Sequence, residues 1–272
     1  MSNGLESESQ SLDRVLSIEI ARVTERAAVA AATLRGRGDE RAADSAAIEA
    51  MRRELAALSI SGTVVVGEGE REQVSSLYIG ECLGAGGPDV DLALDSLEGT
   101  TICAKNLPNA LTILAVATSG GLMHAPDVYM EKIAVGPGYP DGVVGLDRSP
   151  RDNLEALAKA KGVPVGQITA CILDRPRHAN LIAQIRDAGA AIRLIGDGDI
   201  AGVIQTTDPR ETGIDIYMGI GGAPEGVLAA AALSCMGGQM EGRLQLNTGE
   251  RRTRAEKLGL GDPDRIYRLG DM

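Results

Sequence analysis

The second half of the chain alternates short apolar runs with helical patterns, and this alternation constrains the fold more than any other feature. Strands are expected at 168–173, 191–195 and 214–217, and helices at 152–161, 177–188 and 225–235. Strands that alternate with helices are typical of βαβ units on a parallel sheet. The sequence therefore predicts an α/β fold, with helices packed against the sheet.

The first half begins with two helical patterns, expected at 12–33 and 43–58, and continues with strands at 63–66, 90–94 and 111–116. A segment rich in Gly and Pro at 136–145 indicates a boundary between two lobes. We therefore expect a disordered tail at 1–12, an N-terminal lobe at 13–140 and a C-terminal lobe at 141–272.

The charge and the aromatic content limit the possible ligands. The 272 residues carry a formal net charge of −11 and include no Trp, no Phe and five Tyr. An anionic surface repels nucleic acid, and few rings are available for base stacking, so nucleic-acid binding is not expected. Anionic phosphates remain possible ligands, because a bridging divalent cation is often the largest local charge in its site.

Neither a membrane span nor a zinc site is expected. No apolar run approaches the roughly 20 residues that span a bilayer, and the start, MSNGLESESQ, is polar and acidic. We expect a cytoplasmic protein without membrane association. The four cysteines are far apart and there are two histidines, so a Cys/His zinc site is not expected, and all four cysteines are expected to be buried thiols.

The segment 90–101, VDLALDSLEGTT, is the most informative for chemistry. A strand runs directly into a turn that carries Asp95 and Glu98, followed by the hydroxyl of Thr100. Carboxylate oxygens are the ligands that Mg²⁺ and Mn²⁺ prefer, and a tight turn can direct both side chains at one ion. The alternative is an Asx-turn with a solvated glutamate.

Three further carboxylates occupy similar positions. Glu68 follows a strand between two glycines, Asp44 lies near the start of the second helix, and Glu225 opens a later helix. Each also has an ordinary interpretation: a solvated turn residue, an N-cap, and a charge that offsets the helix dipole. From the residues alone, both interpretations stay open.

Phosphate contacts are expected from the sequence Arg175-Pro176-Arg177, because guanidinium groups at the end of a strand and the start of a helix bind anions well. The segment 197–199, Asp-Gly-Asp, follows another strand and can hold sugar hydroxyls or form a turn. A dinucleotide-binding motif from Gly219 fails because Pro224 stands where a glycine is needed. No G-x-S-x-G motif is present, which leaves water activated by a metal as the nucleophile.

Many segments together resemble class II fructose-1,6-bisphosphatase, in the same order and over nearly the whole chain from about residue 13. They are GRGDERAADSAAIEAMR, TVVVGEGERE, LYIGE, VDLALDSLEGTT, APDVYMEK, PRH, DGD, YMGIGGAPEG and RLGDM. The resemblance implies a layered α/β sugar-phosphatase fold like that of inositol monophosphatases, with two closely packed lobes. It also implies hydrolysis of the 1-phosphate of fructose 1,6-bisphosphate to fructose 6-phosphate, in gluconeogenesis or the Calvin cycle. Some relatives also hydrolyse sedoheptulose 1,7-bisphosphate.

The resemblance also implies site residues, a divalent cofactor, Mn²⁺ or Mg²⁺, and a homo-oligomer. Asp44 and Glu68 would hold one ion, and Asp95, Glu98 and Glu225 a second. The catalytic group would be Asp95, Glu98 and Thr100, with Thr100 orienting the nucleophile. The substrate would contact Glu98, Gly99, Thr100, Tyr129, Arg175, Pro176, Arg177, Asp197, Gly198, Asp199 and Gly222.

The chain departs from the family pattern in four places, one of which is the segment 73–76, QVSS, where Ala-Pro-Met is expected before LYIGE. Ser96 stands where the family turn has Pro, and Glu40 stands where some relatives have Lys. The chain ends at Met272, where relatives continue, so a truncated C-terminal lobe is expected. Two alternatives to a fructose-bisphosphatase therefore remain: a related inositol or sugar-phosphate phosphatase, and a non-catalytic family member.

Overall fold

The fold is described from a computed structural model, which describes residues 5–272 and the side chains from residue 16 onward. The chain divides into two compact units, Met1–Ser119 and Gly120–Met272. The lobe boundary expected from the sequence lay later, after residue 140. The strand at Tyr129–Val135 belongs to the second unit because it pairs with two strands of that unit.

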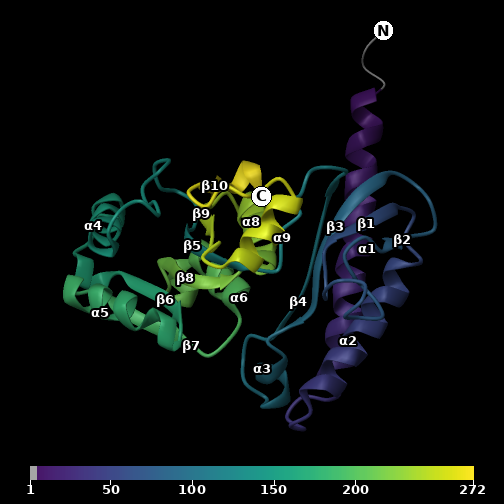
Figure 1. Cartoon of the computed structure of the whole chain (residues 1–272), viewed down its shortest axis with the longest axis horizontal. Coiled ribbons are helices and arrows are strands. Elements are labelled where there is room, and N and C mark those ends of the chain that lie inside the picture. Colours follow the sequence, from purple (N-terminus) through teal and green to yellow (C-terminus); the bar gives the residue numbers. More distant parts are fainter. Residues whose placement is uncertain (1–4) are drawn as a thin grey trace. The chain divides into compact units, whose positions relative to one another are not determined.

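The first unit is a four-stranded sheet with two long helices on one face (Figure 1). The strand order is β2-β1-β3-β4, in which β1 and β3 are parallel and the other pairs are antiparallel. Its elements are α1 (Leu5–Ala32), α2 (Glu40–Leu55), β1 (Ser61–Val66), β2 (Cys82–Leu83), β3 (Asp89–Glu98), α3 (Thr100–Ala104) and β4 (Leu111–Thr118).

The core of the first unit is built from small and aliphatic side chains. Ala27 and Ala31 of α1 and Ala43 and Ala47 of α2 are fully or almost fully buried in one cluster, together with Leu92 of β3. Small side chains let two helix backbones approach closely, so α1 and α2 can pack tightly on each other and on the sheet. This packing places the start of α2 beside the ends of the strands.

The second unit contains a six-stranded mixed sheet in the order β10-β9-β5-β8-β6-β7. Its strands are β5 (Tyr129–Val135), β6 (Thr169–Leu173), β7 (Ala191–Ile195), β8 (Ile216–Gly222), β9 (Gln239–Leu244) and β10 (Tyr267–Arg268). Its α-helices are α4 (Pro150–Lys161), α5 (Ala179–Ala188), α6 (Asp199–Ile204), α7 (Pro209–Thr212), α8 (Ala223–Met236) and α9 (Gly249–Lys257). Four short 3₁₀ turns complete the described part: η1 (Val165–Gln167), η2 (Pro176–His178), η3 (Gln205–Thr207) and η4 (Leu269–Asp271).

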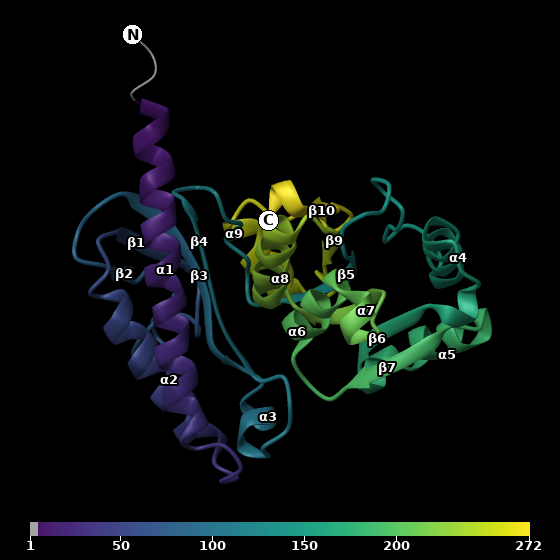
Figure 2. The ribbon, with the colours of Figure 1, turned by 180° about the vertical axis from the view of Figure 1, so that it is seen from behind.

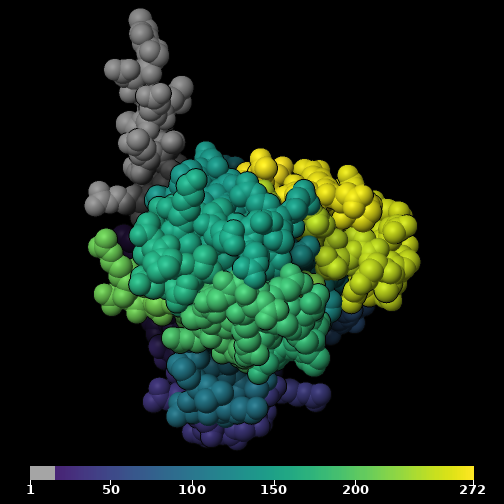
Figure 3. Space-filling model, turned by 90° about the vertical axis from the view of Figure 1, so that its left-hand side faces the viewer, coloured from purple at the N-terminus to yellow at the C-terminus, as the bar shows by residue number. Residues whose placement is uncertain are grey.

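Helices cover both faces of this sheet. Ile216 and Met218 of β8 pack in one cluster with α4 and α5, which lie side by side in Figure 3. The intervening Tyr217 points to the opposite face, where a Cβ on Gly202 of α6 would lie 3.1 Å from its ring. Figure 2 shows α6 and α8 together on that face. The result is a helix–sheet–helix layering, in agreement with the predicted α/β class.

Several sequence predictions need correction. The sheet of the second unit is mixed rather than parallel: β8, β6 and β7 are parallel, but β5 and β9 pair antiparallel. The helix expected from residue 12 begins at Leu5, and the one expected from residue 43 begins at Glu40. Residues 1–4 of the predicted tail lie outside the described residues.

The cysteine prediction holds for two residues and is wrong for two. Cys103 and Cys171 are buried, but Cys82 and Cys235 are exposed, because one lies on the short edge strand β2 and the other in the last turn of α8. In the part of the chain that the structure describes, no helix combines the length and apolar character needed to cross a bilayer.

Candidate active site

The acidic loops of the first unit meet at one edge of its sheet. β1 and β3 are parallel neighbours, so the loops that follow them leave from the same edge. The backbone N–H of Ser96 donates a hydrogen bond to Glu68 Oε1 at 3.0 Å, which joins the two loops directly. Gly67 allows the first loop to turn here, because a Cβ at this position would lie 2.2 Å from the Leu77 carbonyl oxygen.

A β-bulge directs Asp95 and Glu98 to the same side of the sheet. Asp95 pairs with Ile113 of β4, but Glu98 pairs with Leu111, so three steps on β3 match two on β4. Residues three apart on a regular strand point to opposite faces, and the extra residue of the bulge restores a common face. Leu97 N–H also donates to Asp95 Oδ1 at 3.0 Å, so the Asx-turn considered as an alternative forms within the bulge.

Asp44 lies close enough to Glu68 for the two carboxylates to interact. The N-cap of α2 is Asp39, which accepts a hydrogen bond from Ala42 N–H, so Asp44 lies inside the helix and does not cap it. Burial, with repulsion from Glu68, raises the pKa of Asp44 to about 6. Neither carboxylate forms an ion pair with any basic side chain among the described residues. A bound cation would offset the repulsion between them.

The turn after Glu98 places two threonines at the start of α3. Gly99 has a φ of 81°, a left-handed conformation that glycine adopts easily, and Thr100 follows as the first helical residue. Thr101 Oγ1 donates to Glu40 Oε1 at 2.8 Å, which ties α3 to the start of α2. Glu40 thus forms a contact within the first unit.

In the second unit, Glu225 and Asp199 surround a buried lysine. Lys132 of β5 is 1% exposed, and its Nζ lies 2.5 Å from Asp199 Oδ2 and 2.8 Å from the carbonyl oxygen of Gly222. Burial, followed by the charge of Asp199, raises the pKa of Glu225, and Lys132 opposes this shift. Glu225 Oε2 is buried and forms no hydrogen bond with any described residue, so it is a candidate ligand for a cation.

Sequence reasoning did not single out Lys132. The available signal was a cationic residue inside an apolar strand, YMEKIAV, where a lysine is rarely buried unless it is paired. Gly222 contributes by lacking a side chain, because a Cβ there would lie 1.9 Å from Glu225 Oε2.

Arg177 and His178 fasten the end of β6 to β8. Arg177 Nε and Nη2 both donate to the Ile220 carbonyl oxygen, at 2.9 and 2.7 Å. His178 Nε2 accepts from Ile220 N–H at 2.7 Å, so Nδ1 carries the proton that it shares with the Leu173 carbonyl oxygen. Burial lowers the pKa of His178, so the ring is neutral in this arrangement.

Apart from residues 98–100, the predicted substrate residues lie in the same unit as Arg177 and His178. Arg177 lies over the Tyr129 ring at 4.9 Å. Arg175 Nη2 lies 4.0 Å from Asp197 Oδ1, and Gly198, with a φ of 83°, starts α6 so that Asp199 occupies its first position. A cavity of about 530 Å³ is lined by Asp127, Val128, Tyr129, Gly222, Pro224, Glu225, Thr248, Glu250, Arg251 and Arg254.

Comparisons with known proteins identify related enzymes. Residues 14–272 match the family model described as bacterial fructose-1,6-bisphosphatase, glpX-encoded. The chain belongs to this family. Two relatives named D-fructose 1,6-bisphosphatase class 2/sedoheptulose 1,7-bisphosphatase, from Synechococcus sp. (strain JA-3-3Ab) and Parasynechococcus marenigrum (strain WH8102), are 40% identical over 96% of this chain and 82% of their own length. One of the same name from Prochlorococcus marinus (strain NATL1A) is 39% identical with the same coverage.

Membership of the bacterial fructose-1,6-bisphosphatase family makes the chain a member of a class of metal-dependent phosphoric monoester hydrolases of carbohydrate metabolism. The donor set fits a hard divalent cation, since it consists of carboxylates at strand and helix ends. Among the described residues, no three His, Cys, Asp or Glu side chains gather closely enough to form a complete metal site. The acidic groups are instead divided between the two units, Asp44, Glu68, Asp95 and Glu98 in the first and Glu225 in the second.

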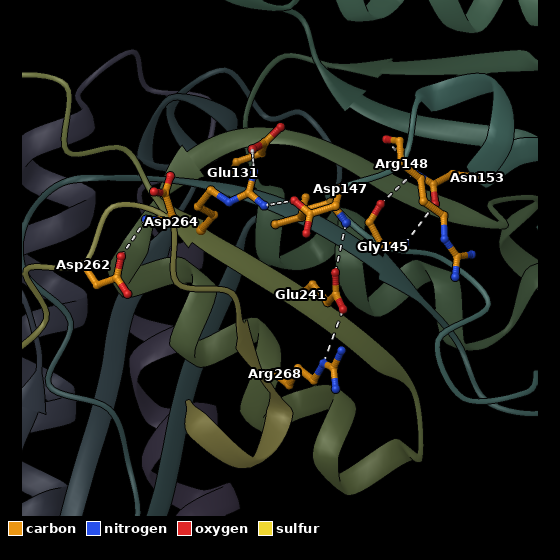
Figure 4. Close-up of polar contacts among 11 residues, drawn as sticks. Glu131, Gly145, Asp147, Arg148, Asn153, Glu241, Asp262, Asp264 and Arg268 are labelled. Carbon is orange, nitrogen blue, oxygen red and sulfur yellow. Dashed lines mark hydrogen bonds and ion pairs between the residues drawn. The ribbon is translucent and has the colours of Figure 1, made fainter.

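A polar cluster around Arg243 and Glu241 of β9 has a structural role (Figure 4). Arg243 of β9 lies 3.8 Å from Glu131, its cross-strand partner on β5, and also pairs with Asp147. Glu241 accepts from Leu146 N–H at 2.9 Å and from Arg268 Nε at 3.3 Å. These contacts hold the loop around 145–148 against the sheet.

Proposed function

We propose that this chain hydrolyses the 1-phosphate of fructose 1,6-bisphosphate, giving fructose 6-phosphate and phosphate, with Mn²⁺ or Mg²⁺ as the cofactor. The observation that carries the proposal is the Ser96–Glu68 hydrogen bond, which joins two acidic loops at one sheet edge in a chain of this family. We place the reaction in gluconeogenesis or the Calvin cycle, in the cytoplasm, and in a homo-oligomer. The fold we propose is the layered sugar-phosphatase fold of the inositol monophosphatase type.

The acidic residues would hold the ions. Asp44 and Glu68 would bind one cation, and Asp95, Glu98 and Glu225 another. When bound, these ions lower the pKa of a water molecule and offset charge on the phosphate. Asp44, whose pKa is raised by burial and by the neighbouring Glu68, gains more from a cation than a carboxylate that is already neutralised by lysine or arginine.

The remaining residues would position the reactants. The Thr100 hydroxyl, at the start of α3, would orient the attacking water, and Gly99 would let the phosphate approach the backbone closely. Arg175 and Arg177 would bind phosphate oxygens, and Tyr129, Asp197, Asp199 and Gly222 would line the sugar. Phosphoryl transfer depends chiefly on such positioning and charge neutralisation.

The decisive experiment measures phosphate release from fructose 1,6-bisphosphate by the purified chain with Mn²⁺, Mg²⁺ or EDTA. Sedoheptulose 1,7-bisphosphate and inositol monophosphate serve as comparison substrates. We expect metal-dependent release from the bisphosphates and none from the inositol ester. Preference for the inositol ester would make the chain a related phosphatase, and metal binding without any turnover would make it a non-catalytic family member.

The variant Asp95→Asn tests the metal assignment. We expect loss of turnover and of metal-dependent thermal stabilisation while the fold persists, because the amide keeps the shape of the side chain but not its charge. The matched control is Asp89→Asn, at the exposed start of the same strand. Normal turnover in Asp95→Asn would remove Asp95 from the site.

A further inference from the structure

Two arginines from distant parts of the second unit converge on one aromatic ring. The guanidinium Cζ atoms of Arg177 and Arg251 lie 4.9 and 5.1 Å from the centre of the Tyr129 ring. Arg177 belongs to η2 after β6, whereas Arg251 is in the first turn of α9. Stacking on the ring is favourable for each cation, and it brings two positive charges to one aromatic side chain.

The charge of Arg251 is not neutralised by the protein. Arg251 Nη1 donates to the neutral amide oxygen Asn247 Oδ1 at 2.8 Å, and no carboxylate among the described residues forms an ion pair with it. Arg254, one turn further along α9, differs because it pairs with Glu250 and Asp127. Arg177 likewise uses its donors on a carbonyl oxygen rather than on a carboxylate.

Arg251 and Tyr129 line the same cavity as Glu225. This cavity of about 530 Å³ has the size of a small-ligand site. Glu225 Oε2, also on its wall, is buried and forms no hydrogen bond with a described residue. The cavity therefore offers Arg251, a cation that is not paired with a carboxylate, and Glu225, a carboxylate suited to a metal. Arg177 adds a second cation at the Tyr129 ring, so the arrangement matches a ligand with two separate phosphates.

We propose that Arg251, together with Arg177, binds the phosphate of the sugar bisphosphate that is not hydrolysed. This inference rests on the proposed bisphosphatase activity. A phosphate bound beside Tyr129 would offset the two positive charges and accept unused N–H donors of both guanidinium groups. Arg251 then determines specificity for a bisphosphate over a monophosphate, because only the bisphosphate has a second anionic group to place there.

The test compares Arg251→Gln with Arg252→Gln. The two substitutions remove the same charge from adjacent positions of α9, but Arg252 is exposed, and the cation–π contacts of Tyr129 among the described residues are with Arg177 and Arg251. We expect Arg251→Gln to raise KM for fructose 1,6-bisphosphate roughly 10- to 100-fold with little change in kcat, the range for losing a hydrogen bond to a charged group. KM for fructose 1-phosphate should not change, and Arg252→Gln should resemble the wild type with both substrates.

Calorimetric binding of fructose 6-phosphate in EDTA gives a readout that does not depend on turnover. We expect Arg251→Gln to weaken this binding by a similar factor and Arg252→Gln to leave it intact. Equal behaviour of the two variants, or no binding to the wild type, would overturn the role of Arg251. If the wild type fails to hydrolyse the bisphosphate but the binding loss is specific to Arg251→Gln, the proposed function fails and the phosphate subsite stands.

Discussion

The two units compensate their acidic residues in different ways. In the first unit, Asp44 and Glu68 repel each other, and the contact made by Glu68 is to the backbone amide of Ser96. In the second unit, Asp199 and Glu225 lie next to Lys132, whose ammonium group is fully buried between β5, α6 and the start of α8. The first arrangement leaves negative charge for an external cation, whereas in the second Lys132 compensates Asp199 and leaves Glu225 Oε2 without a hydrogen bond from any described residue.

This difference has consequences for stability. The stability of the second unit depends on the single side chain of Lys132, because its loss leaves the buried carboxylate of Asp199 without a cation. In the absence of a metal ion, the ionised carboxylates Asp44 and Glu68 repel each other and lower the stability of the first unit. The difference shows that a carboxylate with an ion-paired lysine, such as Asp199, is distinguished from Asp44 and Glu68, which form no ion pair among the described residues.

The largest effect is expected for Lys132→Met. This change leaves Asp199 and Glu225 buried without their cation, and we expect a loss of about 3–5 kcal/mol in the free energy of unfolding. Urea denaturation measures it, with the exposed Lys105→Met as the control. Adding Asp199→Asn to Lys132→Met should recover part of the loss. A change below about 1 kcal/mol would mean that the second unit does not depend on this lysine.

His178→Phe should lower the free energy of unfolding by about 2 kcal/mol, less than Lys132→Met. The change leaves the buried Leu173 carbonyl and Ile220 N–H without their partner. It should also change the pH dependence of unfolding. The folded pKa of His178 lies below its usual 6.5, so the neutral ring stabilises the fold above that pH and the contribution is lost as the pH falls. Thermal melts from about pH 7.5 to 5 should therefore fall for the wild type and remain flatter for the variant. Parallel melting curves would contradict this role.

Asp44→Asn, in the first unit, should increase the free energy of unfolding, unlike the two preceding substitutions. The folded pKa is raised from 3.8 to about 6, so stability is lost as the pH rises through this range. In EDTA near neutral pH we expect a gain of about 1 kcal/mol, a value reduced for the solvent exposure of this half-buried group. The gain should disappear below pH 3.8. Glu49→Gln, exposed on the same helix, is the control, and a destabilised Asp44→Asn protein near neutral pH would show that the two carboxylates do not repel each other.

The smallest effect is expected for Ser96→Ala. Ser96 is 0% exposed and its Oγ forms no hydrogen bond with a described residue, whereas its N–H holds Glu68. Alanine removes the buried hydroxyl but keeps the amide, so we expect a gain of up to about 1 kcal/mol with unchanged metal dependence. Ser61→Ala, which loses a hydrogen bond to the Gly87 carbonyl at the surface, should be slightly destabilising. A clear loss of stability in Ser96→Ala would show that the hydroxyl has a partner.

Local patterns in the sequence predicted most of the elements. The strands expected at 168–173 and 191–195 and the helices expected at 152–161 and 177–188 are confirmed as β6, β7, α4 and α5, because burial of one face imposes a short period that is visible in the sequence. The antiparallel strands β5 and β9 were missed. Their sequences contain Glu131, Lys132, Glu241 and Arg243. Glu131 pairs with Arg243 across the sheet, and Lys132 pairs with Asp199 of α6, so these charged side chains are accommodated by contacts with distant segments.

The sequence alone determined the α/β class, the family and the acidic loops that follow the strands, because these depend on residue type and local periodicity. Tertiary structure decided how the charges are used. The bulge that turns Asp95 and Glu98 to one side, the lysine that offsets Asp199 and Glu225, and the meeting of Arg177 with Arg251 over Tyr129 all depend on strand register and on contacts between distant segments. Such contacts leave no local period, so only the folded chain shows which carboxylates are already compensated and which remain to bind a cation.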